Sequence, residues 1–156
     1  MPVLDLDHAR ELAAAFRREG RRIVFATGAF DLLHPGHLRF LTAARAEGDA
    51  LIVGVQGDRA VREACGPSRP VTPQHERAEI VAALDPVAAV VVLEDSVRDA
   101  ITVLQPEVLA QGADVPDQIG GGVAVDTWGG RVVRIPIEQG WSTASIIEGI
   151  QRKTRP

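Results

Sequence analysis

The amino-acid sequence predicts a single-domain α/β fold, doubly wound, with five parallel strands and helices on both faces of the sheet. Three observations predict it. Short apolar runs rich in Val, Ile and Ala alternate with longer amphipathic segments of helical period. Gly, Pro and Asp stand where one kind of segment gives way to the other. The chain has 156 residues, enough for one domain with a sizeable core, and we expect residues 1–156 to form it.

The first half of the chain is expected to supply two strands and four helices. A leading helix lies within residues 1–20, capped by Asp5 or Asp7 and ended by Gly20. An apolar run over 23–26 is typical of a buried parallel strand. In chain order there follow a helix over 36–47, a strand over 50–55, a short helix over 59–64, a loop over 66–70 and a helix from Thr72-Pro73 to about 84.

The second half repeats this alternation. We expect a strand over 87–93, a helix capped by Ser96 that ends near 104, and a short strand over 108–111. A weaker helical pattern covers 117–128, and a strand over 132–135 follows it. Ser142-Thr143 caps a last helix that ends near 153, and the tail over 150–156 is expected to fray.

Composition excludes several classes of protein. The net charge of −4 disfavours a general affinity for nucleic acid, although a local basic pocket for a nucleotide is compatible with it. The single cysteine, Cys65, excludes an internal disulfide and fits a reducing compartment. No apolar run is long enough for a signal peptide or a membrane span. We therefore expect a cytoplasmic protein that contacts neither nucleic acid nor membrane, as a monomer or a homodimer.

The loop after the first buried strand carries the strongest chemical signal. Gly28 lets the backbone turn tightly and approach a ligand. His34 and His37 follow, and the next helix begins between them. The unpaired N–H groups and positive dipole end of a helix start suit a phosphate. Two imidazoles three residues apart at that place can donate hydrogen bonds to one phosphoryl group. The alternative is that they only cap the helix.

The loop resembles a known signature. Its eleven residues, Thr27-Gly-Ala-Phe-Asp-Leu-Leu-His-Pro-Gly-His37, resemble the Gly-x-Phe-Asp-x-x-His-x-Gly-His motif of the cytidylyltransferase-like nucleotidyltransferases. The resemblance implies a Rossmann-like nucleotidyltransferase fold. It also implies transfer of a nucleoside monophosphate from an NTP, bound with Mg²⁺, to a phosphorylated small molecule. The implied catalytic residues are His34 and His37, and the implied nucleotide-binding residues here are Thr27, Gly28, Ala29, Phe30 and Gly36.

A second block points to one branch of that family. Gly66-Pro-Ser-Arg-Pro-Val-Thr-Pro-Gln-His-Glu-Arg77 resembles a stretch of the heptose 1-phosphate adenylyltransferases. This implies ATP as donor, heptose 1-phosphate as acceptor, and contact of Arg77 with the nucleotide phosphates. Cys65 stands where that branch has a lysine. Either Arg62 or Arg69 binds the acceptor phosphate instead, since arginine forks hold phosphate well, or the acceptor differs and Gln111 donates a hydrogen bond to one of its hydroxyls; we expect the first.

Two further stretches complete the resemblance. Gly140-Trp-Ser-Thr143 is similar to the Gly-x-Ser-Thr-Thr stretch that closes the site, which implies that Gly140, Ser142 and Thr143 hold phosphates; Ala144 replaces the second Thr. Gln111-Gly-Ala-Asp114 occupies the place of Lys-Gly-Gly-Asp, so Gln111 and Asp114 are expected on the acceptor. No protein metal site is expected.

Three functions remain open from the sequence. The first is transfer of AMP from ATP to heptose 1-phosphate. The second is a CTP-dependent reaction on glycerol 3-phosphate or a phosphonate, which shares the core motifs. The third is a nucleotide-binding module with weakened catalysis, suggested by the lost lysines and by Ala144.

Overall fold

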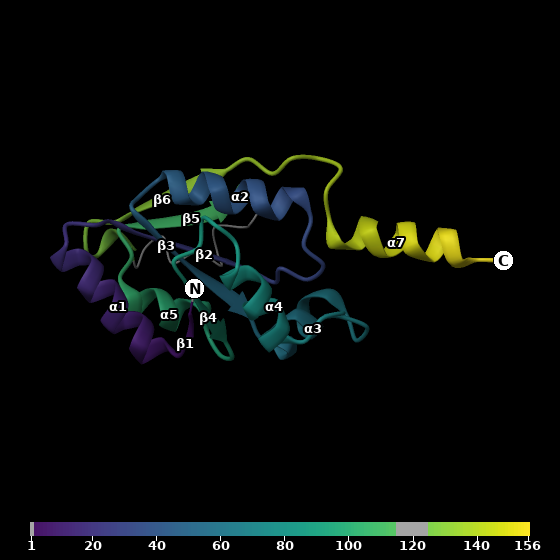
Figure 1. The fold of residues 1–156 in the computed structure, drawn as a ribbon, viewed down its shortest axis with the longest axis horizontal. Helices are drawn as coiled ribbons and strands as arrows, with labels where there is room; N and C mark the ends of the chain where they lie inside the picture. Colours follow the sequence, from purple (N-terminus) through teal and green to yellow (C-terminus); the bar gives the residue numbers. More distant parts are fainter. Residues whose placement is uncertain (1, 115–124) are drawn as a thin grey trace.

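The computed structural model describes residues 2–114 and 125–156. Strands and helices alternate along the chain as expected (Figure 1). In chain order the elements are β1 (Val3–Leu4), α1 (Leu6–Arg18), β2 (Ile23–Gly28), α2 (Pro35–Ala46), β3 (Ala50–Gln56), α3 (Asp58–Cys65), α4 (Gln74–Ala82), β4 (Ala89–Leu93), α5 (Val97–Leu104), β5 (Val108–Gly112), β6 (Arg131–Ile135) and α7 (Thr143–Thr154).

The α/β fold class is confirmed, and the described part of the sheet has six strands where the sequence predicts five. All of its strand pairs are parallel. The additional strand, β1, pairs Val3 with Val90 and Leu4 with Val91 at the edge of the sheet. A strand of two residues is too short to show any hydropathy period, so only its pairing with β4 reveals it.

The strand order places the loop after β2 at a special point of the sheet. The order is β1-β4-β3-β2-β5-β6. From β2 the chain builds β3 and β4 on one side, then crosses to build β5 and β6 on the other. β2 and β5 are therefore the neighbours between which the winding reverses, and ligands bind beyond the carboxyl ends of the strands at such a point.

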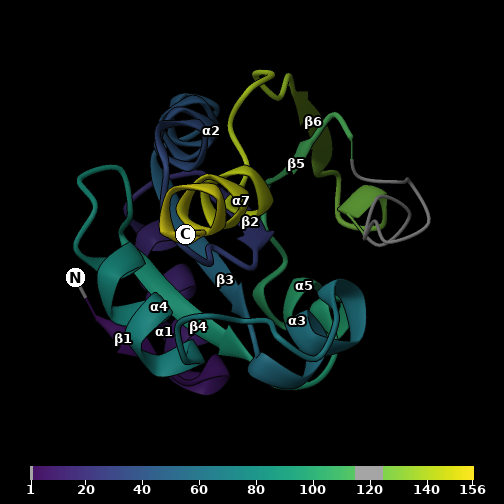
Figure 2. The same ribbon diagram turned by 90° about the vertical axis from the view of Figure 1, so that its right-hand side faces the viewer.

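Two apolar layers hold the sheet between its helices (Figure 2). Val24 and Ala26 of β2 pack into the layer that includes Leu41 of α2 and Val81 of α4. Ile23 and Phe25, the alternate residues, pack into the opposite layer with residues of α1 and α5, because successive strand residues point to opposite faces. Because β2 is packed on both faces, its position in the sheet is fixed, and so is the position of the loop that follows it.

The C-terminal helix α7 extends beyond the rest of the molecule (Figure 1). Thr143 is its buried residue. The helix continues to Thr154. Fraying of residues 150–156 stays a prediction. The helix expected over 117–128 lies largely outside the described residues. No helix in the described part of the chain is long and apolar enough to cross a membrane.

Candidate active site

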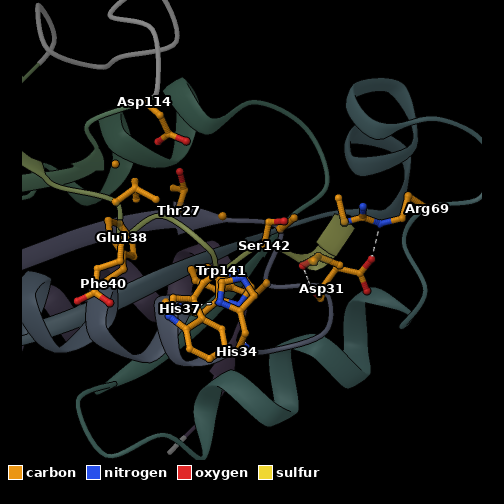
Figure 3. A pocket seen from close by; sticks show the side chains of 18 residues that line it. Thr27, Asp31, His34, His37, Phe40, Arg69, Asp114, Glu138, Trp141 and Ser142 are labelled. Atoms are coloured by element: carbon orange, nitrogen blue, oxygen red, sulfur yellow. Dashed lines mark hydrogen bonds and ion pairs between the residues drawn. The ribbon is translucent and has the colours of Figure 1, made fainter. Parts of the chain in front are cut away.

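A pocket of about 400 Å³ opens at the carboxyl ends of β2 and β5 (Figure 3). Its wall is built from the β2–α2 loop, the loop before α4, the end of β5 and the connection from β6 to α7. Its size is in the range of small-molecule sites. The sequence-predicted residues that line it are Thr27, Gly28, Ala29, Phe30, His34, Gly36, His37, Arg69, Asp114, Ser142 and Thr143.

His34 and His37 cap α2 and line the pocket at the same time. The amide of His37 donates to Nδ1 of His34, and the amide of His34 donates to Nδ1 of His37, each at a distance of 3.3 Å. The two rings stack with centroids 3.7 Å apart. Capping, the alternative that the sequence left open, is therefore correct for both residues, and it does not remove them from the pocket.

The reciprocal caps assign the ring tautomers. Because each Nδ1 accepts a backbone N–H, a neutral ring must carry its proton on Nε2. Burial lowers the pKa of His34. Burial, followed by the neighbouring His34, lowers the pKa of His37 to about 4, although Asp31 opposes this shift. At neutral pH the site therefore holds two uncharged Nε2–H donors.

The low pKa of His37 predicts acid-sensitive folding. Unfolded, this side chain takes up a proton near pH 6.5, whereas the folded protein resists it to about pH 4. The unfolded state thus binds more protons between these values, and the contribution of His37 to stability falls as pH is lowered from 6.5 to 4, by up to about 3 kcal/mol. Urea unfolding across this range measures it. His37→Gln should flatten the profile, and exposed His75→Gln should not; an unchanged profile in His37→Gln would refute the assignment.

The turn after β2 is made by residues other than the glycine that the sequence suggested. Phe30 and Leu32 have φ of 50°, the left-handed region that bulky residues rarely adopt. Gly28 instead ends β2 beneath the Phe30 ring, where a Cβ would lie 3.0 Å from two ring carbons. The role of Gly28 is thus to admit that ring, which packs edge-on against His37 with centroids 5.4 Å apart.

Gly36 gives a direct test of this packing. A Cβ at Gly36 would lie 2.9 Å from the His34 ring and 3.0 Å from Cβ of Trp141. Gly36→Ala should therefore displace His34 and lower turnover roughly ten- to hundredfold, because small misplacements at a reacting centre are costly. Steady-state kinetics measure the loss. Gly149→Ala is the matched control, since its Cβ meets nothing within 4 Å and alanine favours α7. Full turnover in Gly36→Ala would contradict this placement of His34.

Arg77 corrects the sequence interpretation. It does not line the pocket: its side chain is 1% exposed and its guanidinium is surrounded by protein acceptors. Nε donates to Thr72 O, and Nη1 donates to Ala29 O and Gln56 O. Nη2 donates to Asp58 Oδ1 over 2.7 Å. Arg77 therefore joins the ends of β2 and β3 to α3 and to the loop before α4.

The start of α7 presents backbone donors to the pocket. Ser142 caps the helix by accepting the amide of Ser145 on its Oγ. The Thr143 hydroxyl donates to Asp31 O, so its proton is already used. The amides of Thr143 and Ala144 precede the first intrahelical bond, which Ile146 donates to Ser142 O. These amides and the dipole of α7 suit an anion, and a second hydroxyl at Ala144 is not needed for that.

The four acceptor residues predicted from sequence separate into two groups. Arg69 lines the pocket while its Nε donates to Asp31 Oδ2 over 2.8 Å, and Asp114 lines the far end of the pocket. Arg62 is exposed on α3, and Gln111 is half-buried on β5; neither is part of the pocket wall. Gly140 is likewise outside it and has φ of 92°, so its glycine serves the turn into α7.

Several pocket residues escaped the sequence analysis. Phe40 comes from α2, and Ile137, Glu138 and Trp141 come from the β6–α7 connection. The Trp141 ring lies 20° from parallel to the His34 ring, with centroids 6.4 Å apart. Glu138 forms an ion pair with Arg39 of α2. Trp141 directly precedes Ser142 and Thr143 in the sequence, and this position was the signal that could have identified it as a pocket residue.

This chain is similar to a solved structure and to several curated proteins. The crystal structure of the lipopolysaccharide core biosynthesis protein from Thermoplasma volcanium matches with a TM-score of 0.65 and 25% identity, over 76% of this chain and 98% of that one. The bifunctional protein HldE of Methylobacillus flagellatus is 45% identical over 93% of this chain. HldE of Gluconobacter oxydans is 38% identical over 96% of it. This chain spans only 30% and 32% of the length of those two relatives.

A family model matches residues 25–141, a region that includes most of β2, the paired histidines and most of the pocket wall. That region is well over half of the chain. The chain therefore belongs to the cytidylyltransferase-like family.

Proposed function

We propose that this chain transfers AMP from ATP to heptose 1-phosphate, forming ADP-heptose and releasing pyrophosphate. Nucleotidyl transfer is the reaction class of the family. The observation that carries the proposal is the pair of Nε2–H donors of His34 and His37, set between the amino ends of α2 and α7. Similarity to the HldE proteins and the Gly66–Arg77 block support the choice of ATP and heptose.

The proposed chemistry needs no general base. The acceptor phosphate is anionic near pH 7 and attacks the α-phosphorus in line. One P–O bond forms to the acceptor oxygen while the bond between the α-phosphorus and the bridging oxygen breaks, and pyrophosphate leaves with that electron pair. The protein supplies position and charge stabilisation. His34 and His37 donate to the α-phosphoryl oxygens, and the helix amides bind the remaining phosphate oxygens.

Mg²⁺ is proposed to enter as part of the substrate, coordinated by the NTP phosphates. Among the described residues no group of three His, Cys, Asp or Glu side chains is placed to hold a metal ion. Asp31, the acidic residue closest in sequence to the histidines, is already used by protein donors. Substrate phosphates are among the ligands that Mg²⁺ commonly takes in such sites.

The two ends of the pocket differ in charge, which orients the substrates. Arg69 lies at one end and Asp114 at the other, with the histidines between them (Figure 3). We place the acceptor phosphate at Arg69, because a carboxylate repels a phosphate. Asp114 then accepts hydrogen bonds from sugar hydroxyls. Asp114→Asn should raise the KM for the acceptor several-fold and leave the KM for the NTP unchanged. Equal changes in the two KM values would contradict a contact of Asp114 with the acceptor alone.

A pyrophosphate-release assay tests the proposed function. The purified chain is given each of the four NTPs with Mg²⁺ and either heptose 1-phosphate, glycerol 3-phosphate or a phosphonate. The fastest release is expected with ATP and heptose 1-phosphate, and His34→Ala/His37→Ala serves as the inactive control. Preference for CTP and glycerol 3-phosphate would overturn the proposal. Nucleotide binding without turnover on any acceptor would identify a binding module instead.

The setting of the reaction follows from its donor. We propose a cytoplasmic location, where ATP is supplied and where the single cysteine stays reduced. Size-exclusion chromatography of the same preparation reads whether the chain is a monomer or a homodimer.

A further inference from the structure

Asp31 is a buried carboxylate at the edge of the pocket with all of its hydrogen bonds made to protein. It lies between β2 and α2, and its side chain is 0% exposed. Oδ2 accepts a hydrogen bond from Arg69 Nε at 2.8 Å and another from the amide of Val71 at 2.9 Å. Oδ1 accepts the amide of Thr72 over 3.0 Å. These bonds attach the histidine loop to the loop that precedes α4.

The backbone of the same residue holds a third segment. Asp31 O accepts the hydroxyl of Thr143, the first residue of α7 (Figure 3). One residue thus connects the histidine loop, the Arg69 loop and the helix start whose amides line the pocket. These hydrogen bonds hold the three segments in one arrangement.

The backbone on either side of Asp31 needs such support. Phe30 and Leu32 both have φ of 50°. Left-handed conformations of non-glycine residues cost about 1 kcal/mol or more each and persist only where the surroundings hold them. Asp31 lies between these two residues, and its hydrogen bonds stabilise their backbone conformation.

Asp31 also determines which edge of Arg69 a ligand can meet. The Arg69 side chain is 14% exposed and lines the pocket. Its ion pair with Asp31 is made through Nε, so the two Nη groups are the edge that remains for a phosphate. Burial opposes ionisation of Asp31, but the amides of Val71 and Thr72 and the Arg69 guanidinium together lower its pKa below the ordinary value. The carboxylate is therefore charged at neutral pH.

We propose that Asp31 is a positioning residue for acceptor recognition: it fixes the Arg69 fork toward the acceptor phosphate and couples that fork to the start of α7. The inference rests on the proposed function for the identity of the acceptor, and on the described contacts for the coupling. Asp31 acts through Arg69 and does not itself meet the reacting atoms.

A double-mutant cycle tests the coupling. Asp31→Asn and Arg69→Ala should each raise the acceptor KM about tenfold or more, with the KM for the NTP changed less than about twofold. The double variant should be no worse in acceptor KM than Arg69→Ala, because the same contact is removed twice. Asp85→Asn and Arg98→Ala, both exposed and outside the pocket wall, are the matched controls. Additive effects, or equal changes in both KM values, would overturn the proposal.

A second variant keeps the test decisive if Asp31→Asn does not fold. Arg69→Lys retains one charge for Asp31 but has no fork to serve carboxylate and phosphate together. It should raise the acceptor KM as Arg69→Ala does. A normal acceptor KM in Arg69→Lys would overturn the fork geometry.

Binding of inorganic phosphate separates this inference from the proposed function. Calorimetry with phosphate needs no turnover, and both Arg69 variants should weaken the phosphate binding that the unaltered chain shows. Suppose that the unaltered chain releases no pyrophosphate with heptose 1-phosphate, but that phosphate binding is weakened in Asp31→Asn and Arg69→Ala and no further in the double variant. The proposed function then fails and the role of Asp31 stands. If turnover is normal and phosphate binding ignores both Arg69 and Asp31, the role of Asp31 fails alone.

Discussion

Replacing either His34 or His37 with alanine is expected to lower turnover at least about a hundredfold, or roughly 3 kcal/mol in activation free energy. In the proposed mechanism each ring supplies one Nε2–H donor to the α-phosphoryl group, and the caps hold that donor in place before substrate arrives. Pre-positioned donors of this kind cost no reorganisation during the reaction. Single-turnover kinetics with ATP and the best acceptor measure the effect.

Stability of the same variants separates catalysis from capping. His34→Ala also removes the side-chain cap of α2, which should cost about 1 kcal/mol of unfolding free energy. That loss leaves a folded protein, so the fall in turnover comes from the missing donor. His75→Ala, exposed on α4, is the control. Near-normal turnover in either histidine variant would show that the rings act only as caps.

Arg77→Ala is expected to lower the free energy of unfolding by about 3–5 kcal/mol, the usual effect of removing one partner from a buried ionic network. Four hydrogen bonds from the guanidinium hold Thr72, Ala29, Gln56 and Asp58. Without it, these acceptors are left without their donor at the ends of two central strands. Chemical denaturation gives the value, and exposed Arg98→Ala should change it by less than about 0.5 kcal/mol.

The same variant distinguishes the two readings of Arg77. A nucleotide contact, as the resemblance implied, would leave stability intact and raise the KM for ATP. A scaffold role lowers stability and affects both substrates together. Arg77→Lys should also be destabilised, because an ammonium cannot reach four acceptors arranged around a planar fork. A stable Arg77→Lys with a raised KM for ATP alone would restore the original interpretation.

The order of elements could be predicted because hydropathy period and turn residues act locally. Asp5 at the cap of α1, Ser96 at the cap of α5 and Ser142 at the cap of α7 are each signalled by the residue itself. The histidine loop was also predictable, since its spacing and its place between a strand and a helix are both local. β1 was not, because two residues carry no period and its pairing with β4 is distant in sequence.

Local patterns in the chain were enough to predict the α/β alternation, the paired histidines at a helix start, and a phosphate site there. Which arginine lines the pocket became clear only from the folded molecule. Arg69 and Arg77 lie in one motif and were both expected to bind a substrate phosphate, but Arg77 donates to backbone carbonyls at the ends of β2 and β3, whereas Arg69 lines the pocket. Only the fold brings Asp31 and Thr143, 112 positions apart, into contact. Such contacts cannot be predicted locally, because the groups that bury a side chain and accept its hydrogen bonds come from segments remote in sequence.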